Sequence, residues 1–190
     1  MDDLDLYLNE LEGVIHNLSR ADLSAVAEAL VVAWRERRQV FILGNGGSAA
    51  TASHMMNDLN KYCSVPGKPR FRAIALTDNM PLLTAVGNDN DYSEVFVEPL
   101  KSLLQPGDTV IAISASGNSP NVVKAVEYAQ ANGAKVIGFA GQPGGKLAQM
   151  ADLRVVIPSS RIGQQEDGHL ILNHALAFAL RARLEHEPAP

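Results

Sequence analysis

Histidines and carboxylates at helical spacing are the residues of this sequence best suited to acid–base or metal chemistry. His54 and Asp58 stand four residues apart in SHMMND, so on a helix both side chains project from one face. A histidine and a carboxylate one turn apart can bind a divalent metal or share a proton. The same spacing also fits a surface pair without a chemical role, and spacing alone does not decide between the two.

A second group of this kind lies in the segment QEDGHLILNHA near the C-terminus. Glu166 and His174 are eight residues apart, which places them about 80° from one another around a helix, so their side chains can converge from one flank. His169 and His174 are separated by about 140°, and we do not expect them to serve one site. One of the two histidines could therefore be a buried structural residue, and the periodicity does not say which.

Two stretches rich in glycine and serine each follow an apolar run and precede a helical pattern. They are GNGGSAA at 44–50 and ISASGNSPNV at 113–122. Small residues let a ligand approach the backbone, and the free N–H groups at a helix start form an anion site together with the helix dipole. Neither stretch has the lysine of a phosphate-binding P-loop or the spacing of a dinucleotide fingerprint, so we expect no nucleotide cofactor. Ser119 could simply cap a helix, but two such loops in one chain favour a phosphorylated ligand.

An alternation of short strands and helices has to hold these groups in place. Apolar runs predict strands at 39–44, 71–76, 108–114, 135–140 and 153–158. Helical periodicity predicts helices at 3–18, 47–62, 92–104 and 165–186, among others, with a second N-terminal helix before residue 38. The alternation is typical of an α/β domain with a mostly parallel sheet, whose ligands bind beyond the carboxyl ends of the strands.

We expect one domain over residues 1–190, in which a helical segment at 1–37 precedes an α/β core at 38–190. The apolar faces of the two first helices require a partner, which is either the sheet or another subunit.

The composition excludes several classes of function. A formal net charge of −5 offers no basic footprint for nucleic acid, and no apolar run approaches the ~20 residues needed to cross a bilayer. Cys63 is the single cysteine, so no intrachain disulfide can form. We therefore expect a cytoplasmic protein that binds neither nucleic acid nor membrane, and we do not expect Cys63 to be a nucleophile.

The motifs FILGNGGSAATASH, LTAVGND and GDTVIAISASGNSPNVVKAV, in this order, resemble the sugar isomerase (SIS) domain family. The resemblance extends over nearly the whole chain and is greatest to the phosphoheptose isomerases, which convert sedoheptulose 7-phosphate to D-glycero-D-manno-heptose 7-phosphate. It implies the SIS fold, a three-layer αβα sandwich with a five-stranded sheet. It also implies a homo-oligomer, a tetramer built around the N-terminal helices, with sites where subunits meet.

The resemblance also implies roles for single residues. Substrate-binding positions of the family match Asn45, Gly46, Ser48, Asp89, Ser114, Ser116 and Ser119. His54 matches a metal-binding histidine, Asp58 falls where the family has glutamate, and His174 matches the catalytic histidine. His169 then takes the structural role. Glu166 falls at the family's glutamine position when the last helix is matched without a gap, whereas a one-residue gap would place Gln165 there.

These roles imply an aldose–ketose isomerase, with Asp58 or Glu166 as the base and His174 as the acid–base partner. Two histidines and two carboxylates suit zinc, so we expect a divalent ion at His54, Asp58, Glu166 and His174. Thr51, Ser53, Ala115 and Gly163 depart from the family pattern, which leaves room for an isomerase of a different sugar phosphate. A non-catalytic regulator that binds a replication initiator is disfavoured because His174 is kept, and a sugar-phosphate sensor would bind the ligand without turnover.

Overall fold

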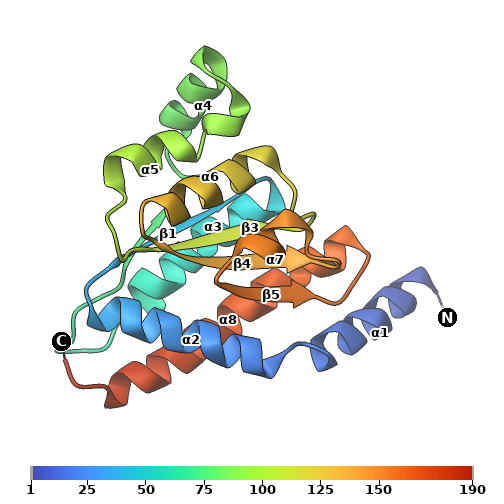
Figure 1. Cartoon of the computed structure of the whole chain (residues 1–190). Helices are drawn as coiled ribbons and strands as arrows, with labels where there is room; N and C mark the ends of the chain where they lie inside the picture. The colour runs from blue at the N-terminus through green and yellow to red at the C-terminus, as the bar shows by residue number, and fades with distance from the viewer. Residues whose placement is uncertain (1, 190) are drawn as a thin grey trace.

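The computed structural model describes residues 2–189 and is built on one parallel sheet (Figure 1). Its strands are β1 (Gln39–Gly44), β2 (Arg72–Ala75), β3 (Thr109–Ser114), β4 (Lys135–Gly141) and β5 (Leu153–Ile157). They are ordered β2-β1-β3-β4-β5, and all four pairings are parallel. A parallel sheet is covered by helices on both faces, so its central strands consist of consecutive hydrophobic residues. For this reason the apolar runs of the sequence predicted these strands.

Helices cover both faces of the sheet, which confirms the three-layer sandwich (Figure 1). They are α1 (Asp3–His16), α2 (Arg20–Arg35), α3 (Gly47–Asn57), α4 (Met80–Asp89), α5 (Val97–Leu103), α6 (Pro120–Ala131), α7 (Gly145–Met150) and α8 (Ile162–His186). Alternate residues of β1 enter the two cores: Val40 and Ile42 pack with α2, α3 and α8, and Phe41 and Leu43 pack on the side of α5, α6 and α7.

The two N-terminal helices differ in how much of their apolar faces the rest of the chain buries. Helix α2 buries a stripe that includes Leu30 and Trp34 between the sheet and α8. Helix α1 extends away from the body (Figure 1), and of its residues only Val14 is classed as buried. Leu4 and Leu8 of α1 are 67% and 54% exposed. The sheet and α8 thus account for the apolar face of α2, while much of the apolar face of α1 stays open.

The helix predicted at 47–62 changes its winding where α3 ends. Residues Asp58–Tyr62 form a π-helical turn, in which the Cys63 amide donates to the Asp58 carbonyl at 2.9 Å. The turn continues the helix with wider hydrogen-bond spacing, and such turns are frequent at functional sites. Asp58 therefore lies at the first position of the irregularity.

Two other helix predictions need correction. The segment predicted as one helix at 92–104 is a short 3₁₀ turn at Tyr92–Glu94 followed by α5. The last helix begins at Ile162, three residues earlier than predicted. Within residues 2–189, no helix is both long and apolar enough to cross a membrane.

Candidate active site

The two glycine- and serine-rich loops converge at one edge of the sheet. They follow β1 and β3, which are neighbours in the sheet with Gly44 paired to Ile113. Between them lies a cavity of about 200 Å³. Its lining consists of Asn45, Ser48, Ile113, Ser114, Ala115, Ser116, Ser119, Ile162 and Glu166. Two segments that are about 70 residues apart in the sequence thus form one pocket with the start of α8.

The hydroxyls of the second loop are arranged for a ligand rather than for capping. Ser119 is the N-cap residue of α6, yet in the described part of the chain its side chain makes no capping hydrogen bond. Its Oγ lies 3.3 Å from the Oγ of Ser114, which also accepts from the Gly117 amide at 3.2 Å. Helix α3 begins after Gly46, whose φ of +53° favours glycine. The pocket is lined by a residue at each helix start, Ser48 of α3 and Ser119 of α6, where the helix dipole favours an anion.

A reciprocal amide pair joins the two loops. Asn45 donates to the Oδ1 of Asn121 at 2.9 Å, and Asn121 donates to the Oδ1 of Asn45 at 2.9 Å. Asn121 is 2% exposed and lies in the first turn of α6, while the Tyr92 hydroxyl donates to Asn45 at 3.1 Å. These bonds fix the amide of Asn45 at the rim of the pocket. Sequence reasoning did not identify Asn121 or Tyr92, because the pairing of β1 with β3 brings Asn121 to Asn45 and the packing of the turn Tyr92–Glu94 on α6 brings Tyr92 there.

Glu166 lies against the start of α3, whereas Gln165 does not. A Cβ on Gly47 would lie 2.5 Å from the Oε1 of Glu166, so a side chain there would displace this carboxylate. Gln165 is buried, and its amide donates to the Ser159 carbonyl at 2.7 Å. Of the two residues that could take the family's glutamine position, the structure brings Glu166 into the pocket.

His54, Asp58 and His174 meet where α3 and α8 pack together. The Nε2 atoms of the two histidines lie 3.1 Å apart, and their distances to Asp58 Oδ2 are 3.5 Å from His54 and 4.0 Å from His174. The Asp58 side chain is 12% exposed, while the two imidazoles are 45% and 55% exposed. Asn173 donates to Asp58 Oδ2 at 2.8 Å from the position before His174.

This group has the composition and spacing of a metal site. Three ligand atoms lie within 4.8 Å of one another. Two ligands of a tetrahedral zinc, each bonded at 2.0–2.1 Å, are separated by about 3.3 Å, which is close to the distances found here. The residues therefore fit a divalent ion. The three-residue group does not include Glu166, whose carboxylate contacts Gly47 instead.

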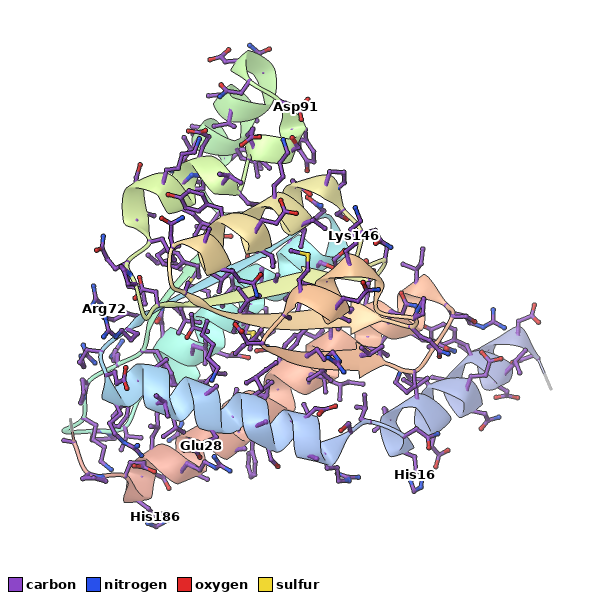
Figure 2. All side chains as sticks on the ribbon, in the orientation of Figure 1. His16, Glu28, Arg72, Asp91, Lys146 and His186 are labelled. Carbon is purple, nitrogen blue, oxygen red and sulfur yellow. The ribbon has the colours of Figure 1, made fainter. Side chains whose placement is uncertain are left out.

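Other predicted residues lie away from this centre. Asp89 is exposed at the end of α4, which projects from the body (Figure 1), and it accepts from the Asn88 amide at 2.7 Å. His16 and His186 point outward from α1 and α8 (Figure 2). Gly46 adjoins the pocket lining through Asn45 and is itself exposed.

His169 and Cys63 are buried. His169 is fully buried and stacks on Phe139 with ring centroids 6.3 Å apart. Burial lowers the pKa of His169 to about 4, and the nearby Ala140 backbone opposes this only in part. Burial also raises the pKa of Cys63 to about 12, so its thiol stays protonated and unreactive.

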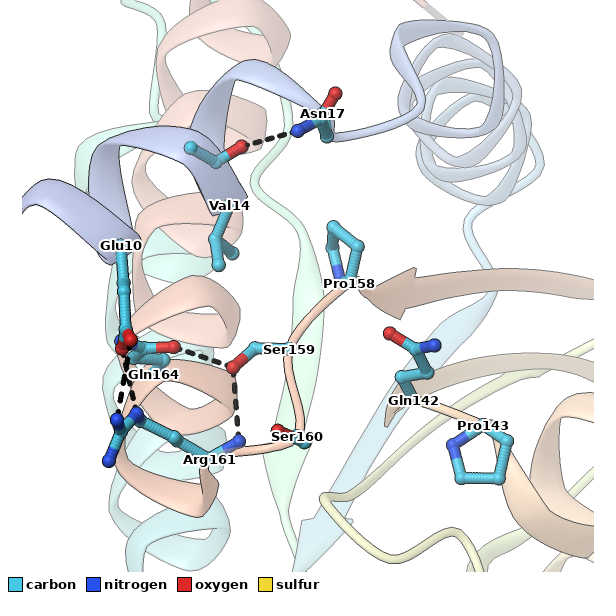
Figure 3. A pocket seen from close by; sticks show the side chains of 11 residues that line it. Glu10, Val14, Asn17, Gln142, Pro143, Pro158, Ser159, Ser160, Arg161 and Gln164 are labelled. Carbon is cyan, nitrogen blue, oxygen red and sulfur yellow. Dashed lines mark hydrogen bonds and ion pairs between the residues drawn. The ribbon is translucent and has the colours of Figure 1, made fainter.

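A larger cavity of about 840 Å³ lies between α1 and the loops after β4 and β5 (Figure 3). A polar network crosses it: Arg161 pairs with Glu10 at 2.7 Å, and Gln164 accepts from Ser159 at 2.6 Å. Gln164 also donates to Glu10 at 2.9 Å, so Arg161 and Gln164 both tie the start of α8 to α1. The cavity contains none of the converging serines or histidines, so we place the chemistry in the smaller pocket and the histidine group.

The comparisons with known proteins agree with this geometry. A family model described as SIS domain matches residues 6–141. The chain is 37% identical over 156 residues to a phosphoheptose isomerase of Trichlorobacter lovleyi, covering 82% of this chain and 79% of the relative. It is 40% identical over 168 residues to one of Thermodesulfovibrio yellowstonii, covering 88% and 83%.

A solved structure leads to the same family. The phosphoheptose isomerase from Neisseria gonorrhoeae superposes with a TM-score of 0.87 at 29% identity, covering 94% of this chain and 97% of that chain. The fold, the order of the motifs and these similarities agree, and the chain belongs to the SIS domain family, among its phosphoheptose isomerases.

Proposed function

We propose that this chain is an aldose–ketose isomerase that converts sedoheptulose 7-phosphate to D-glycero-D-manno-heptose 7-phosphate. The observation that carries the proposal is the arrangement of two sites along two helices. Helix α3 runs from Ser48 in the pocket to His54, a rise of about 9 Å, and α8 runs from Glu166 to His174, about 12 Å. A phosphate held by the serines would thus direct the rest of the sugar toward the histidine group.

The length of a heptose suits this separation. An extended chain advances roughly 1.2 Å per bond, so six carbon–carbon bonds span about 7 Å between C7 and C1. With its phosphate bound by Ser114 and Ser119, a seven-carbon sugar can bring its carbonyl end to His54 and His174. Asn45 and Ser48 lie at the start of this path, where they can bind hydroxyls of the sugar. Asp89, which is exposed and not among the residues that line the pocket, would contact a hydroxyl of the sugar at the open side of the pocket.

The reaction transfers a proton between neighbouring carbons. A carboxylate, Asp58 or Glu166, removes a proton from C1, and the electron pair forms the C1–C2 double bond of the enediol. His174 donates a proton to the C2 oxygen in the same step. The C1 hydroxyl then loses its proton, the double bond electrons take up a proton at C2, and the carbonyl is left at C1. His174 Nε2 lies 4.0 Å from Asp58 Oδ2, so the two groups could serve neighbouring atoms of the sugar.

A divalent ion, zinc by ligand type, would be held by His54, Asp58 and His174, and by Glu166 after a change of its side-chain rotamer. When bound, such an ion polarises the carbonyl and stabilises the charge of the enediolate. Ion binding and proton transfer would compete at Asp58, Glu166 and His174, because an atom bound to the ion cannot accept or donate a proton. Asp58 or Glu166 would serve as the base, and His174 as the acid, only while its atom is free of the ion.

We also propose that the chain acts as one SIS domain in a homotetramer in the cytoplasm. The segment 1–37 would serve assembly, since the exposed leucines of α1 form an apolar face that a second subunit can cover. The resemblance to the family would place the half-exposed histidines where subunits meet. The single cysteine, buried and protonated, fits a reducing compartment.

Incubation of the purified protein with sedoheptulose 7-phosphate tests the proposed reaction. We expect an aldose heptose 7-phosphate, seen by NMR, together with exchange of one carbon-bound proton with solvent deuterium. Binding of the sugar phosphate without product would favour a sensor, and turnover of another ketose phosphate alone would change the substrate. A protein that neither binds nor converts a sugar phosphate would contradict the proposal and favour a regulatory role.

A further inference from the structure

Asp58 is held from behind by a side chain that sequence reasoning did not single out. Its Oδ2 atom is the one that faces both imidazoles, at 3.5 Å from His54 and 4.0 Å from His174. Asn173 donates to this same oxygen at 2.8 Å. The other oxygen, Oδ1, has a contact of 3.5 Å with Asn57, at the outer limit of a hydrogen bond. The position of Oδ2 therefore depends on Asn173.

The orientation of the Asn173 amide follows from electrostatics. If the amide were turned by 180°, its carbonyl oxygen would face a carboxylate oxygen, and two acceptors would repel each other. The amide must present its NH₂ group to Asp58. An asparagine adds no charge, so it can orient the carboxylate without neutralising it, which a lysine or arginine in its place would do.

The surroundings of Asn173 show that the amide is not there for packing. Asn173 is 1% exposed on the core face of α8, among Leu172, Leu176 and Ala177. In the part of the chain that the structure describes, its Oδ1 atom has no hydrogen-bond partner. A buried acceptor without a partner is unfavourable, and a leucine would fill the same volume without that cost. Within residues 2–189, the one hydrogen bond of the Asn173 side chain is to Asp58.

We propose that Asn173 is a positioning residue that fixes the Asp58 carboxylate for binding of a divalent ion. The inference rests on the proposed function for the ion itself. Asp58 begins the π-helical turn, so its backbone is not held by regular helix geometry on both sides. Asn173 supplies the missing constraint from the residue next to His174. Helix α8 thus contributes one ligand, His174, and the side chain that supports a second ligand, Asp58. To hold a ligand in place is the usual role of an outer-shell hydrogen bond at a metal site.

Calorimetric titration of the metal-free protein with Zn²⁺ alone tests the proposal. We expect Asn173→Leu to weaken zinc binding by about 10- to 100-fold, as is typical when an outer-shell partner is lost. Asn57→Leu is the matched control, since it removes a longer contact to the other oxygen of the same carboxylate, and its affinity should stay within about threefold of wild type, well short of that outer-shell loss. Thermal unfolding of each variant separates this effect from a loss of packing.

The outcomes are distinguishable. Unchanged zinc affinity in Asn173→Leu, with lowered stability, would mean a structural role and would overturn the inference while the proposed metal site stands. If the wild-type protein binds no zinc, the proposed metal site is wrong. The proposed role of Asn173 in positioning a metal ligand is then wrong as well. A double-mutant cycle of Asn173→Leu with Asp58→Ala, measured by unfolding in EDTA, then shows separately whether the two side chains are coupled in the free protein.

Discussion

The Nε2 atoms of His54 and His174 lie 3.1 Å apart, although 120 residues separate the two histidines in the chain. Two neutral imidazoles that point their lone pairs at each other repel, so either one nitrogen carries a proton or a cation binds between them. Asp58 Oδ2, at 3.5 Å and 4.0 Å, provides negative charge for either arrangement. The contact between the two histidines thus joins α3, which follows the first loop, and α8 in one candidate site.

Replacing either histidine of this pair should abolish stoichiometric metal binding. His54→Ala and His174→Ala each remove one of three ligand atoms, and two remaining atoms do not hold zinc tightly. Metal analysis after stripping and reloading with Zn²⁺ should give one ion per wild-type chain and none in either variant. His16→Ala, a histidine exposed on α1 (Figure 2), is the control. Full metal content in both variants would place the ion elsewhere.

Glu166→Gln should change two affinities in opposite directions. The carboxylate lies at the start of α3 in the pocket proposed for phosphate, so its removal should tighten binding of inorganic phosphate by about tenfold, on the order of 1.4 kcal/mol. Loss of the same charge should weaken zinc binding if Glu166 is a ligand. Both are measured by calorimetry, with Glu185→Gln at the far end of α8 as the control. Phosphate affinity that does not move would remove Glu166 from the anion site.

The serine hydroxyls should contribute mainly to binding of the substrate phosphate. Ser119→Ala and Ser114→Ala each remove one neutral donor to a charged group, which corresponds to about 10- to 100-fold in affinity. We expect KM to rise with a smaller change in kcat, because the phosphate is remote from the carbons that react. Ser102→Ala on the surface of α5 should leave KM unchanged. Normal KM values in both pocket variants would refute phosphate binding in this loop.

Asn121→Ala should impair the reaction even though Asn121 does not line the pocket. The substitution removes both amide bonds to Asn45 and frees its side chain, so kcat/KM should fall by about tenfold or more. Asn132→Ala, at the other end of α6, removes a bond to the Tyr128 carbonyl on the surface and serves as the matched control. Equal activity of the two variants would show that Asn45 needs no support from Asn121.

His169 should make the protein less stable in acid. Burial lowers its pKa in the folded protein to about 4 from the ordinary 6.5, so in this interval the unfolded chain binds more protons. The free energy of unfolding should therefore fall as the pH falls from 6.5 to about 4, by about 3 kcal/mol for this residue. His169→Phe should flatten this part of the pH profile in urea unfolding. The slope is the readout, because the larger ring also changes packing. An equally steep profile in the variant would assign the acid sensitivity to other groups.

The sequence by itself determined the elements that carry the site. The runs at β1 and β3 are apolar enough to require a covered parallel sheet, and the loops after them have the local chemistry of helix starts. Hydrophobic periodicity and turn chemistry are properties of neighbouring residues, so they can be read without knowing the fold. The rule that ligands bind at the carboxyl ends of parallel strands then placed both loops at one edge of the sheet, whereas the pairing of β1 with β3 came from the structure.

Only the tertiary structure decided which side chains meet. Periodicity left His169 and His174 open as candidates, and the packing of α8 buries the first and turns the second toward His54. Periodicity also could not choose between Gln165 and Glu166. These neighbouring residues have different partners: Gln165 bonds to Ser159, and Glu166 lies against Gly47. Nor could periodicity predict the π-helical turn at Asp58 or the support from Asn173. The reason is physical: a contact between two helices depends on their rotation and separation, which the whole core fixes and no local pattern encodes.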